Sequence, residues 1–275
     1  MSAVMKSYKQ IFTLPPSDEG AVGAFKNIGL FIQETSSEHS SRMGISITAL
    51  QAANLTWVLA RQQFLLLRVP KPGEKVEIET WPSSLGKILC QRDFTIRNEE
   101  GETLGHSLTD WAVVNVQTRK AERIPEFICH KYPSKSNFAM PELNLKPSAL
   151  PSEDRRKTFT AQHEDIDINN HVTSTRYVDF MLDTARDVMD AGSRPLFLDI
   201  IYRAESLEGD RIESRIVPAD ANEMKELDKN FTELLPSGPL HAYWHNLVKM
   251  EKKILFITKE SEKELVRGFS LWLKE

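Results

Sequence analysis

Three polar residues at alternate positions, Asp167, Asn169 and His171, could together carry acid–base chemistry. A carboxylate and an imidazole can move protons near neutral pH, and an amide can both donate and accept hydrogen bonds. Ile166 and Ile168 stand between them. In an extended chain the three polar side chains would share one face and the isoleucines the other. The spacing therefore predicts a compact polar cluster just before a helix.

Two metal sites are alternatives for this stretch. The pattern D-x-D-x-N at 165–169 resembles the start of a calcium loop, but Asn170 and Arg176 stand where such a loop needs Gly and a bidentate Glu. A zinc site would need His163 and His171 on one helical face, which the alternation does not favour. We therefore expect no metal here.

Helix capping is the second alternative. Asn169 or Asn170 could cap the following helix, and the aspartates would lie near its positive end. Capping does not require a histidine two residues beyond Asp-x-Asn, so the pattern leaves a functional reading open beside the structural one.

The cluster is expected to lie between a short extended segment and a long helix. Apolar residues at helical spacing predict a helix over 172–191. An extended segment at 157–163 precedes it. Strands are predicted after it, at 195–205, 210–218, 241–250, 253–259 and 265–273.

The first half of the chain shows the same plan of a helix followed by strands. A helix is predicted around 27–43, and alternating apolar segments joined by short turns predict antiparallel strands at 55–69, 74–81, 87–98 and 103–116. The segment from 126 to 154 is rich in proline and serine and has no sustained period, which is typical of a linker.

The two halves also resemble each other in amino-acid sequence. PGEKVEIE at 72–79 matches EGDRIESR at 208–215, and SLTDW at 107–111 matches GFSLW at 268–272. This duplication predicts an α+β fold in which antiparallel sheets wrap long central helices. The expected domains are residues 1–125, a linker at 126–154, and residues 155–275.

Composition excludes several classes of protein. The net charge of −4 gives no electrostatic case for nucleic acid, and two cysteines are too few for a disulfide framework. No apolar stretch approaches the length of a membrane span, and the first residues do not read as a signal or transit peptide. We expect a cytoplasmic protein without nucleic-acid or membrane partners.

Four segments, taken in order, resemble the acyl-(acyl carrier protein) thioesterases known from plant plastids. The polar stretch EDIDINNHVTSTRYVDF is similar to that family's D-x-D-x-N-x-H-V motif. The other similar segments are LTWVLARQQFLLLRVPKPGEKVEIETWPSSLGK, GETLGHSLTDWAVVNVQTRKAERIPE and IIYRAESLEGD. The resemblance covers nearly the whole chain and implies a bacterial member with two tandem hot-dog folds.

The resemblance implies a catalytic set of Asp167, Asn169, His171 and Glu205 in the second repeat. Ser206 stands where the family has a cysteine, and Thr173-Ser174 replace its Asn-Asn. Both differences are departures from the family pattern.

The first half has no Asp-x-Asn-x-His before its helix, so we expect it to supply an apolar groove for the acyl chain. The candidate lining residues are Ile28, Phe31, Ile32 and Trp57. A thioesterase of this kind would release free fatty acid from acylated phosphopantetheine on acyl carrier protein and end fatty acid synthesis, with no cofactor. An acyl-coenzyme A thioesterase, a non-catalytic acyl-binding module and a homodimer remain open.

Overall fold

The structure is a computed structural model, and it describes residues 7–132, 138–140, 155–187, 189, 192–218, 251–259 and 263–274. The chain divides into two compact units, Met1–Met140 and Pro141–Glu275, called here the N-terminal and C-terminal units. The predicted strand at 241–250 lies outside the described residues.

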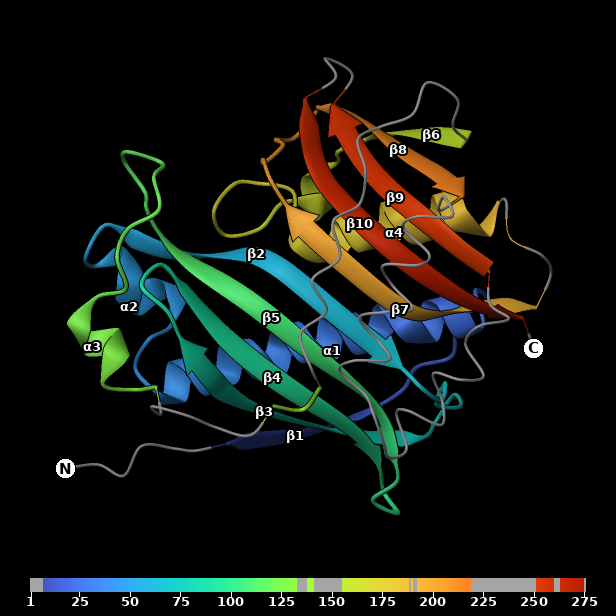
Figure 1. Ribbon diagram of the computed structural model, residues 1–275, viewed down its shortest axis with the longest axis horizontal. Helices are drawn as coiled ribbons and strands as arrows, with labels where there is room; N and C mark the ends of the chain where they lie inside the picture. Colours follow the sequence, from blue (N-terminus) through green and yellow to red (C-terminus); the bar gives the residue numbers. More distant parts are fainter. Residues whose placement is uncertain are drawn as a thin grey trace. The chain divides into compact units, whose positions relative to one another are not determined.

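The N-terminal unit is an antiparallel sheet with one long helix packed against it (Figure 1). Its strands run in the order β1-β3-β4-β5-β2. The elements are β1 (Tyr8–Thr13), α1 (Ala21–Arg42), α2 (Ile47–Gln51), β2 (Leu55–Leu66), β3 (Lys75–Leu85), β4 (Leu89–Asn98), β5 (Thr103–Asn115) and α3 (Glu126–Cys129).

The C-terminal unit repeats this plan. Its strands run in the order β6-β8-β9-β10-β7, so each strand has a counterpart at the same place in the first sheet. The elements are β6 (Arg155–Thr160), the 3₁₀ turn η1 (His163–Asp165), α4 (Ser174–Arg186), β7 (Ser193–Tyr202), β8 (Arg211–Pro218), β9 (Glu251–Lys259) and β10 (Glu264–Lys274). The predicted duplication is confirmed.

One side-chain hydrogen bond recurs in both repeats. The indole Nε1 of Trp111 on β5 donates to Thr109 at 2.9 Å, and that of Trp272 on β10 donates to Ser270 at the same distance. The sequence similarity between SLTDW and GFSLW therefore corresponds to equivalent strands and to equivalent contacts.

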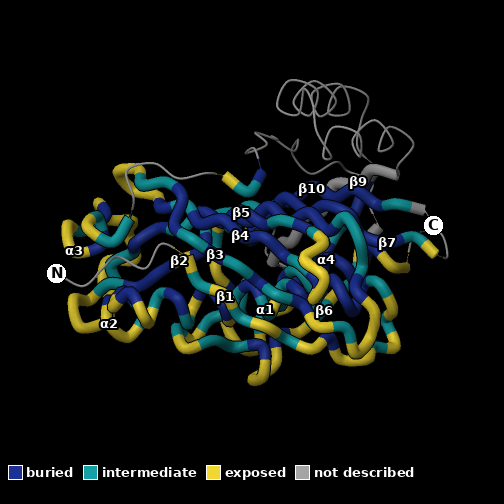
Figure 2. The backbone as a smooth tube through the Cα atoms, turned by 90° about the horizontal axis from the view of Figure 1, so that it is seen from below, coloured by how far each residue is buried: buried dark blue, intermediate teal, exposed yellow. Residues whose placement is uncertain are grey.

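Helix α1 buries a face whose character changes along its length. Phe25, Ile28 and Ile32 are fully or almost fully buried in its first part, whereas the buried residues that follow them are polar: Thr35, Ser36 and His39. The central strands are correspondingly buried, and the exposed residues gather at the ends of the unit (Figure 2). A hydrophobic core therefore gives way to a polar one beneath the last turns of α1.

The end of α1 is anchored to strand β2. Gly44 has φ +71°, which glycine adopts without a steric penalty, and the N–H groups of Gly44 and Ile45 donate to the carbonyls of Ser41 and Ser40. The carbonyl of Ile45 in turn accepts from the indole of Trp57 at 2.8 Å.

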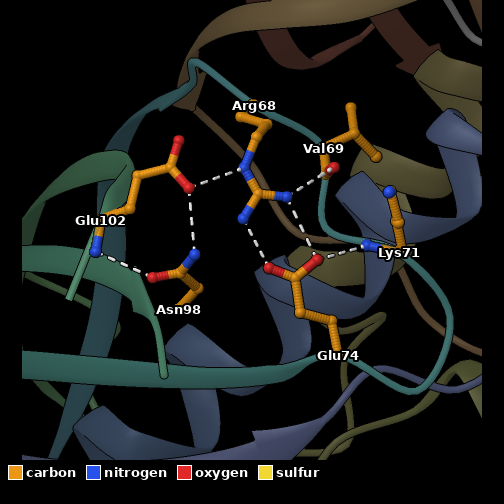
Figure 3. Close-up of polar contacts among 6 residues, drawn as sticks. All are labelled: Arg68, Val69, Lys71, Glu74, Asn98 and Glu102. Atoms are coloured by element: carbon orange, nitrogen blue, oxygen red, sulfur yellow. Dashed lines mark hydrogen bonds and ion pairs between the residues drawn. The ribbon is translucent and has the colours of Figure 1, made fainter. Parts of the chain in front are cut away.

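An ion-pair network joins two turns at the other end of this sheet (Figure 3). Arg68 in the β2–β3 connection forms ion pairs with Glu74 at 2.5 Å and with Glu102 at 3.2 Å, and Asn98 bonds Glu102. The bond to Arg68 lowers the pKa of the Glu74 carboxyl. The network holds the β2–β3 and β4–β5 turns together.

Several predicted boundaries were wrong. Helix α1 begins six residues earlier than predicted, at Ala21, and α4 covers Ser174–Arg186 rather than 172–191. Strand β1 and the short helices α2 and α3 were not predicted. These elements are short or lie before a Gly-rich helix start, so their periodic patterns are weak.

Candidate active site

The polar stretch before α4 is a tight turn and not an extended segment. Ile166 and Val172 form an isolated antiparallel bridge, and the N–H of Asp167 donates to the carbonyl of His171 at 2.8 Å. Asn170 has φ +62°, a left-handed conformation that asparagine tolerates better than most residues. The predicted alternation is therefore wrong, and Ile168, expected in the core, is 65% exposed.

The turn nevertheless gathers the predicted residues around one carboxylate. Asp167 Oδ1 accepts the backbone N–H of Asn169 at 2.8 Å and that of His171 at 3.3 Å. An aspartate that bonds the backbone two residues on closes a local turn of this kind. The cluster is produced by side-chain-to-backbone bonds and not by strand periodicity.

His171 contacts the fourth predicted residue. Its Nε2 lies 2.9 Å from Glu205 Oε2, and Glu205 follows strand β7. The backbone sets this approach, because the N–H of Val172 donates to the carbonyl of Ser206 at 2.9 Å. The residues beside His171 and Glu205 are thus joined directly. The imidazole is mostly buried, and the carboxylate is about half exposed.

Ser206, which stands at the family's cysteine position, is fully buried. Its hydroxyl lies 2.6 Å from that of Tyr177 on α4, and the Tyr202 hydroxyl donates to the carbonyl of Ser174 at 3.2 Å. Burial raises the pKa of Tyr177 to about 12. These hydroxyls tie α4 to the end of β7 and carry no charge near neutral pH.

Helix α4 begins without a capping hydrogen bond from the side chain of its N-cap residue. The N-cap of α4 is Thr173, so the capping alternative for Asn169 and Asn170 was wrong. The N–H groups of Val172 and Thr173 donate to the carbonyls of Ser206 and Asp165. These two amides are engaged within the protein and do not face a substrate as donors.

Asp165, the first residue of the D-x-D-x-N pattern, has a structural role that was not predicted. It is almost fully buried, its Oδ2 accepts the N–H of Gln162 at 2.8 Å, and its Oδ1 lies 2.6 Å from Arg176 Nε. The guanidinium of Arg176 also lies over the ring of Phe180. Gln162 and Asp165 form a capping box, a spacing of three residues that is visible in the sequence.

The candidate groove residues of the N-terminal unit lie in different surroundings. Ile28 and Ile32 are buried in the unit, and Phe31 stacks on Phe12 of β1 with ring centroids 4.2 Å apart. Trp57 lines a cavity beneath the last turns of α1.

Within the described parts of the chain, no cluster of three or more His, Cys, Asp or Glu could hold a metal ion. In the same residues no helix is both long and apolar enough to span a membrane.

Family models match both units. The model of the acyl-ACP thioesterase N-terminal domain matches residues 6–132, and that of the C-terminal domain matches residues 148–238.

Two relatives from Arabidopsis thaliana illustrate the similarity in sequence. Oleoyl-acyl carrier protein thioesterase 2 of Arabidopsis thaliana is 25% identical over 291 residues, which span 98% of this chain and 77% of the relative. Oleoyl-acyl carrier protein thioesterase 1 of the same plant is 25% identical over 228 residues, which span 76% of this chain and 63% of the relative.

Solved structures share the fold. An acyl-ACP thioesterase from Bacteroides thetaiotaomicron matches with a TM-score of 0.73 at 21% identity, and the match covers 99% of this chain and 100% of the Bacteroides chain. The 12:0-ACP thioesterase of Umbellularia californica has a TM-score of 0.78 at 18% identity and covers 98% of both chains. The predicted α+β fold of tandem hot-dog repeats is confirmed.

Proposed function

The chain belongs to the acyl-ACP thioesterase family, and on this basis we propose that it hydrolyses the thioester of fatty acyl-acyl carrier protein. The observation that carries the proposal is the arrangement of Asp167, His171 and Glu205 around one turn and one strand end. Free fatty acid and the carrier thiol are the products, and their release ends fatty acid synthesis.

The chemistry needs an activated water and a proton for the leaving thiolate. Glu205 accepts a proton from water as the water oxygen attacks the thioester carbonyl carbon, and His171, 2.9 Å away, relays that proton. The carbon–sulfur bond then breaks, and the proton passes to sulfur. Asn169 orients the carbonyl or the water through its amide.

Asp167 has two roles compatible with its position. Its Oδ1 holds the turn that carries Asn169 and His171, and the carboxylate can also act as base or as nucleophile. An acyl-enzyme on Asp167 would be detected by rapid quenching and mass spectrometry of the peptide that contains it. Its absence under single-turnover conditions would favour direct attack by water.

In this proposal the two repeats have different roles. Residues 155–275 carry catalysis and residues 1–125 supply the acyl-chain pocket, with 126–154 as the linker. The N-terminal unit lacks an Asp-x-Asn-x-His stretch before α1, and the lining candidate Trp57 lies beside a cavity of this unit.

Acyl-coenzyme A is the alternative substrate because it presents the same phosphopantetheine thioester. A panel of acyl-ACP and acyl-CoA thioesters of 8 to 18 carbons, with released thiol as the readout, tests both. We expect turnover of acyl-ACP at a kcat/KM well above that of the matched acyl-CoA. Thiol release equal to that of Asp167→Asn on every substrate would instead indicate a non-catalytic acyl-binding module.

The cellular setting follows from this function. Acyl carrier protein is the partner that delivers the substrate, and we place the reaction in the cytoplasm. Association into a homodimer is open to measurement by light scattering with analytical ultracentrifugation.

A further inference from the structure

A polar cavity lies in the N-terminal unit beneath the last turns of α1. It measures about 530 Å³ including its open mouth, and is called here the α1 cavity. Ser36, Ser37 and Ser40 line it from one face of the helix, because residues three and four apart share a face. Ser37 is exposed and therefore marks the mouth.

The cavity contains a buried cation. Arg92 on β4 lines it and is only 2% exposed. Its Nη1 lies 2.7 Å from His39 Nδ1 and donates to Thr80 at 3.3 Å, and its Nη2 donates to Ser40 at 3.3 Å. None of these three partners needs to carry a charge. Because arginine can only donate, His39 Nδ1 must accept from Arg92, and the imidazole then carries its proton on Nε2.

No carboxylate balances this charge in the part of the chain that the structure describes. Other arginines of the same unit form ion pairs with glutamates, as Arg68 does with Glu74 and Arg97 does with Glu79. Arg92 has none, and its neighbours Tyr132 and Cys90 are themselves protonated because burial raises their pKa. Burial alone lowers the pKa of Arg92. A buried charge without a counter-charge is costly unless a ligand supplies one.

The rest of the lining offers hydroxyls on one side and aromatic rings on the other. Trp57 and Trp111 both line the cavity, and their indole N–H groups are bonded to Ile45 and Thr109. They therefore present ring surface and not donors. The side chains of Ser36 and Ser37 have no hydrogen-bond partner among the described residues, so they are available to a ligand.

We propose that the α1 cavity binds a carboxylate through Arg92, with a short apolar body packed against Trp57 and Trp111. A guanidinium binds a carboxylate in two parallel bonds. Among the described residues that line this cavity, Arg92 alone is cationic, which suits a single negative charge and not a phosphate dianion. The carboxylate can belong to a free acid or to the far end of an acyl chain.

Calorimetric titration of the full chain with hexanoate tests the site directly, with hexanol as the uncharged probe of equal length. We expect hexanoate to bind and hexanol to bind at least tenfold more weakly. Arg92→Gln should weaken hexanoate at least tenfold. Equal affinity of the wild type for the two probes, or no binding of hexanoate, would overturn the proposal.

A second pair of variants tests the site without relying on Arg92→Gln, which could fail to fold. Ser37→Trp blocks the mouth and leaves every bond of Arg92 in place. Ser41→Trp makes the same change on the exposed side of the same helix, outside the cavity lining. Ser37→Trp should abolish hexanoate binding and Ser41→Trp should retain it. Equal binding by both variants would refute a site in this cavity.

Turnover distinguishes the two sources of the carboxylate. If the cavity holds the end of an acyl chain, dodecanoyl thioester with a terminal carboxylate should show a lower KM than the methyl-ended substrate, and Arg92→Gln should remove the difference. If it holds a free acid, the two substrates will not differ and hexanoate will still bind. This second outcome keeps the site and assigns it to a separate ligand.

The turnover comparison rests on the proposed hydrolysis, whereas the calorimetric binding experiment does not. Asp167→Asn should bind hexanoate as the wild type does, because Asp167 belongs to the other unit. Loss of turnover with retained binding would therefore contradict the proposed function alone.

Discussion

His171 and Glu205 meet because the backbones beside them are hydrogen-bonded, and Asp167 supports His171 through its main-chain N–H. We expect Asp167→Asn and His171→Ala each to lower kcat/KM for acyl-ACP about 100-fold or more, since positioned acid–base groups contribute on that order. Circular dichroism should show both variants folded. Turnover within about threefold of wild type in either variant would remove that residue from the mechanism.

Glu205 and Ser206 should behave in opposite ways on substitution. Ser206 is buried against Tyr177 and does not reach solvent, so Ser206→Ala should keep most of the activity and lose about 1 kcal/mol of stability with the hydrogen bond. Glu205→Ala should lose most of the activity. Steady-state kinetics with a thermal melt of each variant measures both effects.

The matched control for this pair is Tyr177→Phe, which removes the same hydrogen bond from its other end. It should resemble Ser206→Ala in both kcat/KM and melting temperature. Thiol alkylation should leave activity intact, because Cys90 is buried with a pKa raised to about 12 and the partly exposed Cys129 lies outside the unit that carries the proposed catalytic residues. An acyl group trapped on Ser206 would show instead that serine is the nucleophile.

At the scale of the element, the turn from Asp167 to Asn170 decides whether the site forms. Its left-handed residue is Asn170. Asn170→Val places a β-branched side chain in that conformation at a cost of about 1–2 kcal/mol, and should displace Asp167 and reduce kcat. Asn170→Gly adopts the conformation freely and should keep near wild-type kcat. Equal kcat in the two variants would show that the turn geometry is not required.

At the scale of the whole molecule, stability should depend on pH through Asp93. Burial raises the pKa of this carboxyl from 3.8 to about 6, while it accepts the N–H of Ala139 at 2.7 Å. Between these values the folded state keeps a proton that the unfolded state has lost, so stability falls as pH rises through 6. Asp93→Asn should remove this dependence.

The measurement is the free energy of unfolding of wild type and Asp93→Asn from pH 4 to pH 8. The difference, variant minus wild type, should grow with pH by on the order of 2–3 kcal/mol. His106 titrates in the opposite sense, because burial lowers its pKa to about 4, but its contribution cancels in the difference. A difference that stays constant with pH would contradict the assignment.

The sequence by itself determined the duplication, the α+β class and the choice of polar residues near α4. Strand periodicity and turn residues are local signals, so β4, β5 and β8 began and ended close to their predicted positions. The matched motifs repeat these signals in order, which is why the family could be identified before any contact was known.

The tertiary structure decided how the site residues meet and where the polar cavity lies. The contact between His171 and Glu205 joins positions 34 residues apart, and Arg92 meets His39 across 53 residues. No local pattern encodes such pairs, because they depend on how helix and sheet pack. The turn at Asp167 was misread as extended for a different reason: its bonds run from a side chain to the nearby backbone, and these leave the apolar alternation in the sequence unchanged.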